Sequence, residues 1–231
     1  MRKAATENTE GGSQKRIINP VDRRDRDDML GLLYITERFF NKRQLGLDYK
    51  TNGEGFPSNV DVRKIKGNLP DAQKQLAANA LAYFISTGNT WGADVGQRLN
   101  LVEVNILSRE GGTQEAQTIL EIDVTEEMCN LFGIMHGACA AYLFDPATSS
   151  ALVALGLVLG IDGSGVSQSM NIIWHKPARR GAKLRLISNS IAIQGRIRSA
   201  RCEIRDAEGL CVSATHSTIN PGRKFKHGGK L

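Results

Sequence analysis

The pattern of apolar and polar positions changes near residue 97. Before it, apolar residues recur at helical spacing over 29–46, and again after Asp71, which stands where a helix N-cap belongs. After it, six segments rich in β-branched residues predict strands, several with period-two alternation. These are 99–107, 115–124, 166–174, 184–193, 196–204 and 210–219. Short Gly-containing turns between them favour antiparallel pairing.

One apolar segment interrupts the strands. Residues 137–160 are rich in Ala and Leu and apolar almost all round, so a helix there must be buried on most of its surface. The predicted strands are the elements that can cover this helix. The pattern therefore predicts an α+β domain, in which a curved antiparallel sheet encloses a long central helix.

Changes in composition divide the chain into four segments. Residues 1–28 are polar, with the mixed-charge run RRDRDD, and predict a disordered arm. Residues 29–96 predict a helical N-terminal extension, 97–220 the sheet-and-helix domain, and 221–231 a basic tail. The role of the extension is open: it covers an apolar sheet edge or shapes the site.

The formal net charge of +6 is concentrated rather than uniform. Residues 176–205 hold nine Lys or Arg against a single acidic residue, Glu203. Such a patch suits a polyanionic small molecule about as well as a nucleic-acid backbone, and a solvated strand face is the plain alternative. A mean hydropathy of -0.27 and the lack of a long uncharged apolar run argue against a membrane span.

The cysteines and the chain ends bear on compartment. Four cysteines without C-x-x-C spacing make a structural metal site improbable and predict free thiols in a reducing, cytoplasmic setting. Cys139 lies three residues after His136, which is weak support for a Cys nucleophile. The C-terminal Gly-Lys-Leu is close to the S-K-L peroxisomal address, which is the alternative location.

The candidate catalytic residues lie at or near the start of the predicted central helix. Asp145 is the only charge on the helix, and an ionised carboxylate is costly there unless it is hydrogen-bonded or faces a wet cleft. The purely structural alternative is that Asp145 is a helix N-cap, because Pro146 follows it and proline suits the first helical position. Upstream, His136 and Gly137 stand at the loop-to-helix junction, where free N–H groups can hold a carbonyl oxygen.

These residues resemble a known family. The motif N-x5-H-G-x8-D, a G-V-S-x-x-M-N-I strand and a W-H-K-P-A-x-x-G turn are similar to those of hotdog-fold acyl-CoA thioesterases of the phenylacetate-degradation and acyl-coenzyme A thioesterase 13 type. The resemblance covers about residues 97 to 220 and implies a homodimer or tetramer with the site across an interface. It implies no cofactor beyond the coenzyme A of the substrate.

The resemblance also implies a role for each matching residue. The Gly137 N–H, helped by His136, polarises the thioester carbonyl. Asp145, from the neighbouring subunit, acts as general base or nucleophile, Asn130 orients the water or carbonyl, and Ser167 hydrogen-bonds the reacting groups. Phosphates of coenzyme A require cations, and the candidates are Arg179, Arg180, Lys183, Arg196 and Arg198.

Two residues depart from the family pattern, and three other functions are considered beside acyl-CoA hydrolysis. Ala138 replaces the second glycine of H-G-G, and Pro146 removes an N–H and is expected to kink the helix beside Asp145. The same fold also serves in release of carrier-bound acyl chains and in dehydration, although the motif is of thioesterase type. The third possibility is a non-catalytic acyl-CoA binding module. The acyl group itself cannot be predicted from the sequence.

Overall fold

The structure is a computed structural model that describes residues 60–85 and 91–221. The predicted polar arm, the helix over 29–46 and the tail after Pro221 lie outside the described residues. The helical elements are η1 (Val62–Lys64), α2 (Asp71–Ile85), α3 (Ala93–Gly96), η2 (Glu110–Gly112), η3 (Glu126–Met128) and α4 (Gly137–Leu159). The strands are β1 (Asn100–Ser108), β2 (Gln114–Asp123), β3 (Val166–Trp174), β4 (Lys183–Gln194), β5 (Ile197–Asp206) and β6 (Gly209–Ile219).

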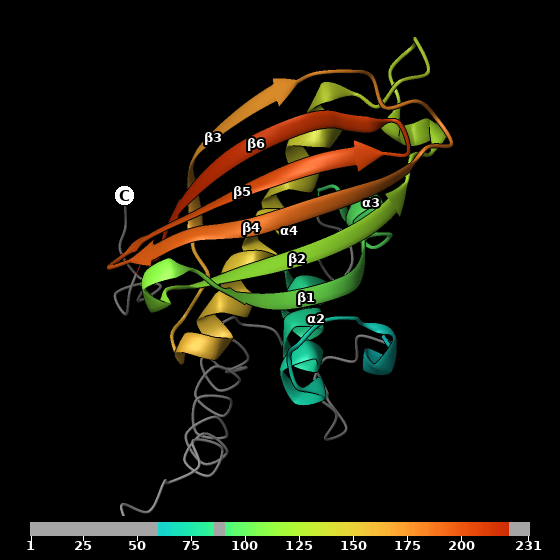
Figure 1. The fold of residues 1–231 in the computed structure, drawn as a ribbon. Helices are drawn as coiled ribbons and strands as arrows, with labels where there is room; N and C mark the ends of the chain where they lie inside the picture. The colour runs from blue at the N-terminus through green and yellow to red at the C-terminus, as the bar shows by residue number, and fades with distance from the viewer. Residues whose placement is uncertain (1–59, 86–90, 222–231) are drawn as a thin grey trace, which may run out of the picture.

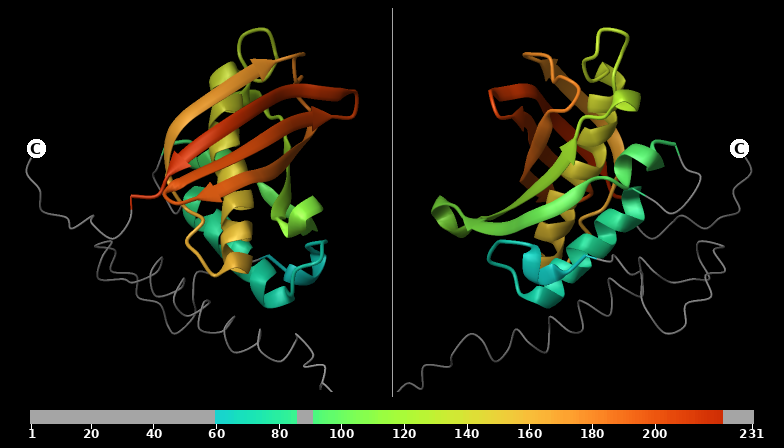
Figure 2. Two further views of the ribbon diagram at one scale, coloured as in Figure 1. Left: turned by 60° about the vertical axis from the view of Figure 1, so that its left-hand side comes forward. Right: turned by 90° about the vertical axis from the view of Figure 1, so that its right-hand side faces the viewer.

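The strands form one antiparallel sheet in the order β1-β2-β4-β5-β6-β3. The sheet curves around α4, which crosses its concave face (Figures 1 and 2). This is the hotdog arrangement, so the predicted fold is confirmed. All six predicted strands are present with ends within two residues. The order places β1 and β3 at the two edges of the sheet, and β3 has β6 as its partner.

Helix α4 runs unbroken for 23 residues. His136 caps its start, and Gly160, in the left-handed region at φ 66°, ends it. Pro146 lies inside the helix, so the alternative that made Asp145 an N-cap is wrong. Among the described helices, α4 alone is long and apolar enough to cross a membrane, and it is mostly buried inside this fold. Its apolar surface is therefore accounted for by the sheet.

Helix α2 packs against α4 and shares its core. Ala77, Ala78, Leu81 and Ile85 are buried in the same apolar cluster as Leu143 and the inner residues of the sheet. Asp71, predicted as the N-cap, is instead the first helical residue, a shift of one position within the usual uncertainty of helix ends. The part of the extension that the structure describes is thus joined to the domain by a common core.

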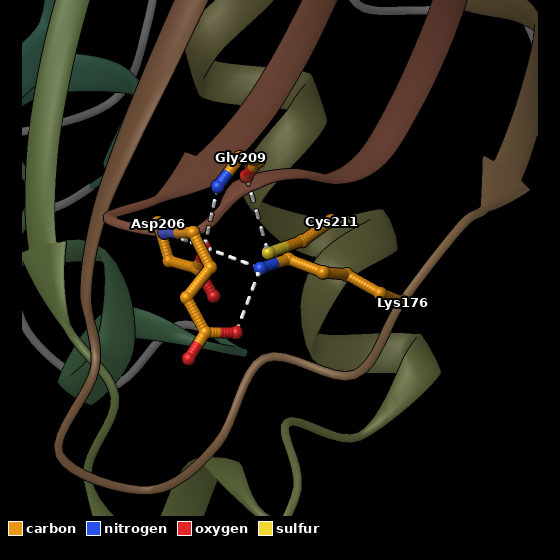
Figure 3. Close-up of polar contacts among 5 residues, drawn as sticks. Lys176, Asp206, Gly209 and Cys211 are labelled. Carbon is orange, nitrogen blue, oxygen red and sulfur yellow. Dashed lines mark hydrogen bonds and ion pairs between the residues drawn. The ribbon is translucent and has the colours of Figure 1, made fainter.

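The β5–β6 turn is fixed by one carboxylate (Figure 3). Asp206 Oδ1 accepts the N–H groups of Glu208 and Gly209 at 2.8 and 3.0 Å, and the Lys176 ammonium at 2.7 Å. Lys176 lies just beyond β3, so this contact ties the end of β3 to the β5–β6 turn. One of the nine cations of the basic region is therefore neutralised within the fold.

Candidate active site

The start of α4 presents a free N–H group. The His136 side chain accepts the N–H of Ala138 at Nδ1, over 3.0 Å, and so caps the helix. The Gly137 N–H donates to no acceptor among the described residues. Because Nδ1 accepts, a neutral His136 carries its proton on Nε2, and the imidazole is exposed. Two donors, Gly137 N–H and His136 Nε2–H, are thus available at one corner for a carbonyl oxygen.

The two nitrogens of His136 can be separated by mutation. In His136→Asn, the amide oxygen can still cap Ala138, so the free energy of unfolding should stay close to wild type. His136→Ala should lose about 1 kcal/mol of stability with the cap. Both variants lack the Nε2–H, and we expect kcat for thioester hydrolysis to fall about 10-fold or more in each. Urea titration together with steady-state kinetics checks this; wild-type kcat in His136→Asn would remove His136 from the oxyanion site.

Asn130 shapes the loop before this corner. Its Oδ1 accepts the Phe132 N–H at 3.0 Å, and its backbone exchanges hydrogen bonds with Gly133 and Ile134. The loop therefore closes as a tight turn that delivers His136 to the helix start. The side-chain amide group of Asn130 remains at the corner, half-buried, and its predicted role toward substrate stays a prediction.

Asp145 is exposed, although most of α4 around it is buried. Its side chain has 56% relative exposure, because α4 presents this turn of the helix at the open edge beside β3. Ser167, at the start of β3, donates to Asp145 Oδ1 over 3.3 Å. The structure therefore brings Ser167 and Asp145 together, as expected, and supplies the wet surface that an ionised carboxylate needs.

Sequence reasoning missed His216, which lies beneath Asp145. Its imidazole is 1% exposed, with Nδ1 at 2.6 Å from Thr148 Oγ1 and Nε2 at 4.0 Å from Asp145 Oδ1. Burial lowers the pKa of His216 below its ordinary value of 6.5, against an opposing effect of Asp145. The signal was available in the sequence, because His216 continues the inward-facing alternation of Val212 and Ala214 along β6.

Within one protomer the two halves of the predicted site lie apart. Asp145 lies nine residues after the cap residue His136, which corresponds to about 13 Å along the axis of α4. Trp174, at the end of β3, contacts the Gly137 corner, while Ser167, near its beginning, contacts Asp145. The strand β3 therefore connects the two halves.

A pocket of about 260 Å³ opens beside Asp145. Its lining comes from α2, α4 and the first residues of β3: Phe84, Tyr142, Asp145, Pro146, Ser149, Gly165, Val166 and Ser167. Phe84 and Tyr142 give it an apolar side, and the Tyr142 ring is held edge-on by Trp91 at 5.3 Å between centroids. Helix α2 thus contributes directly to the surroundings of the carboxylate.

The five predicted cations separate into two groups. Arg179, Arg180 and Lys183 are exposed near the His136 corner, where the Arg180 N–H donates to the carbonyl of the turn residue Gly133. Arg196 and Arg198 lie at the other end of the long β4–β5 hairpin. Arg198 is 5% exposed and donates to the carbonyls of Asp162 and Gly195, so it has no free face for a phosphate. The five candidates therefore do not lie together, and which of them meet a phosphate stays a prediction.

Cys139 is unsuited to act as a nucleophile. Burial raises the pKa of its thiol to about 11, so the thiolate is scarce at neutral pH. Cys139 is also half-buried in the packing of α4. The reactive role of Asp145 stays the prediction for this part of the fold.

Residues 132–213 match the family model described as Thioesterase superfamily, which spans the His136 corner, α4 and the strands β3 to β5. This part of the chain is similar to a thioesterase superfamily domain. Among solved structures, the chain is similar to zebrafish thioesterase superfamily member 2, with 21% identity over 57% of this chain and 88% of that chain and a TM-score of 0.44.

Two further solved structures resemble this chain. The mouse thioesterase superfamily member 2 shares 24% identity over 45% of this chain and 80% of that chain, with a TM-score of 0.40. A hypothetical thioesterase protein with coenzyme A from Streptococcus pneumoniae shares 18% identity over 54% and 90%, with a TM-score of 0.43. The comparison with curated proteins found no match.

Proposed function

We propose that this protein hydrolyses acyl-CoA thioesters to a free acid and coenzyme A, in a site that two copies of the chain build together. One observation carries the proposal: the free N–H of Gly137 and the exposed carboxylate of Asp145 lie at opposite ends of the edge strand β3. Neither half can reach the same thioester in one protomer, since about 13 Å of helix separates them.

Antiparallel pairing of β3 with its copy resolves this separation. A two-fold axis at the middle of β3 would place the Ser167 end of one strand beside the Trp174 end of the other. Asp145 of one protomer would then face His136 and Gly137 of the second. The edge strand carries exposed apolar residues, Val166, Ile173 and Trp174, which such pairing would cover.

The proposed chemistry assigns each half one task. Gly137 N–H and His136 Nε2–H hold the thioester oxygen as negative charge develops on it. Asp145 takes a proton from the attacking water, or attacks the carbonyl itself, and Ser167 orients its carboxylate. On the general-base route the C–S bond then breaks and the leaving sulfur takes the proton that Asp145 received. On the nucleophilic route Asp145 displaces the thiolate and forms a mixed anhydride, and water then splits the anhydride and supplies the proton of the thiol. No Ser-His-Asp triad is required for an ester this reactive.

The coenzyme A end is assigned to the cations at the His136 corner. Arg179, Arg180 and Lys183 are exposed there, and the ion pairs of Arg180 with Glu126 and of Lys183 with Glu121 lie at the surface. Exposed pairs of this kind are worth only about 0 to 1 kcal/mol, so phosphate groups can replace the carboxylates as partners. A carrier-bound acyl chain stays the alternative substrate, because enzymes that release such chains have the same fold.

Subunit complementation tests the proposal. Gly137→Pro and Asp145→Asn chains should each be nearly inactive in release of free thiol from a panel of acyl-CoAs. Refolded or co-expressed as a mixture, half of the dimers pair the two variants, and each of those has one intact site, so activity should return to about a quarter of wild type.

Three outcomes contradict the proposal. No recovery on mixing, with mixed dimers verified by differently tagged chains, contradicts the shared site. Acyl-CoA bound stoichiometrically by the wild type without thiol release favours the non-catalytic binding module. Faster release from acyl carrier protein than from acyl-CoA favours the carrier-bound substrate.

A further inference from the structure

His216 has one ring nitrogen with a partner and one without. Nδ1 lies 2.6 Å from Thr148 Oγ1, whereas Nε2 is fully buried and makes no hydrogen bond within the described part of the chain. A buried polar atom without a partner costs about 1–3 kcal/mol. His216 Nε2 is such an atom, and it lies beside the exposed carboxylate of Asp145, so its lack of a partner needs a physical explanation.

The hydrogen bonds of Thr148 determine where the His216 proton lies. Thr148 Oγ1 is 2.6 Å from the Phe144 carbonyl oxygen and 3.2 Å from that of Asp145. Carbonyl oxygens only accept, so the hydroxyl proton points to them, and Oγ1 must accept from Nδ1–H of His216. A neutral His216 then has a bare lone pair at Nε2.

That lone pair faces Asp145. Nε2 lies 4.0 Å from Asp145 Oδ1, the same oxygen that Ser167 contacts, and the lowered pKa of His216 keeps the ring neutral at pH 7. A lone pair and a carboxylate have no hydrogen bond to share. Once Asp145 is protonated, its O–H can be donated to Nε2 after the carboxyl group moves roughly 1 Å toward the ring.

We propose that His216 is a positioning residue, whose bare Nε2 accepts the O–H of Asp145 once that carboxylate has taken the proton of the attacking water. This inference rests on the proposed hydrolase function and concerns its general-base route. The water O–H bond breaks as the new C–O bond forms, the proton goes to Asp145, and it leaves later on the sulfur of coenzyme A. Because the hydrogen bond exists only with protonated Asp145, it favours proton transfer without binding substrate.

Two variants separate the nitrogens of His216. Asn reaches the position of Nδ1 and can keep the bond to Thr148, whereas Gln extends toward the position of Nε2 and offers an amide oxygen to Asp145. We expect His216→Asn to lower kcat about 10-fold or more with KM unchanged, and His216→Gln to stay within about 3-fold of wild type.

Ser150→Ala is the matched structural control. Ser150 lies on α4, as Asp145 and Thr148 do. The alanine variant loses a buried hydrogen bond of 2.7 Å to Thr118, but Ser150 has no contact with Asp145. Its melting temperature should fall as in the His216 variants while kcat stays at the wild-type value. Nitrogen NMR of the His216 ring provides a readout independent of turnover, and we expect the proton on Nδ1 at neutral pH.

The outcomes distinguish this inference from the proposed function. Wild-type protein that releases no thiol overturns the proposed function and the inference together. With an active wild type, wild-type kcat in His216→Asn, or equal losses in Asn and Gln variants that merely follow their melting temperatures, overturns the inference alone. A ring proton on Nε2 at neutral pH overturns it as well.

Discussion

Asp145→Asn should lower kcat for acyl-CoA hydrolysis by about 10³-fold, because the amide can neither accept a proton from water nor attack the carbonyl. The same change should leave the free energy of unfolding within about 0.5 kcal/mol, since among the described residues the exposed carboxylate accepts one long hydrogen bond of 3.3 Å, from Ser167, and is 4.0 Å from His216 Nε2. Thiol release and thermal unfolding on the same preparations check both parts.

The matched control is Asp94→Asn, which removes another exposed carboxylate, on α3, that does not line the pocket beside Asp145. We expect wild-type kcat from it. If Asp145→Asn turned over like wild type, the assignment of Asp145 would fail whatever the fate of the rest of the site.

Gly137→Pro should have the second largest effect, a fall in kcat of about 10²- to 10³-fold, as found when one oxyanion donor is removed. Proline deletes the Gly137 N–H, yet it suits this position, which is the first of α4. The preceding residue, His136, already has the extended conformation that proline requires, at φ -61° and ψ 138°. The helix should therefore form normally, and circular dichroism checks that it does.

Gly137→Ala provides the control for Gly137→Pro. An added Cβ would lie 3.6 Å from the Trp174 ring, an ordinary contact, and the N–H is retained. Its kcat should remain within about 5-fold of wild type. Equal losses in the alanine and proline variants would mean that crowding, and not the missing donor, lowers activity.

The sequence was most informative where one physical signal dominated. Period-two alternation and Gly-containing turns located the strands to within two residues, and the unbroken apolar run located α4. The loop-helix junction at His136 was equally predictable, because capping and an N-terminal glycine are local properties. Such features depend on neighbours along the chain, which the sequence displays directly.

Features that depend on packing were not predictable in the same way. Asp145 lies on an apolar helix, and nothing local shows that its turn of α4 faces the open edge at β3. Arg198 resembles its basic neighbours, and only the fold directs it to the carbonyl of Asp162. His216 required the register of β6 against α4, which sets a strand residue beside a helix residue 71 positions away.

The common core of α2 and α4 determines what truncation before the first strand would cost the fold. Ile65, Leu69 and Leu81 lie upstream of the first strand, yet each is buried against the main helix and sheet. Cutting at residue 97 would expose their partners to water, at about 25 cal/mol for each Å² of apolar surface. A fragment that begins at residue 97 should therefore be less stable than one that keeps Ile65, Leu69 and α2, and its expression should yield more aggregate.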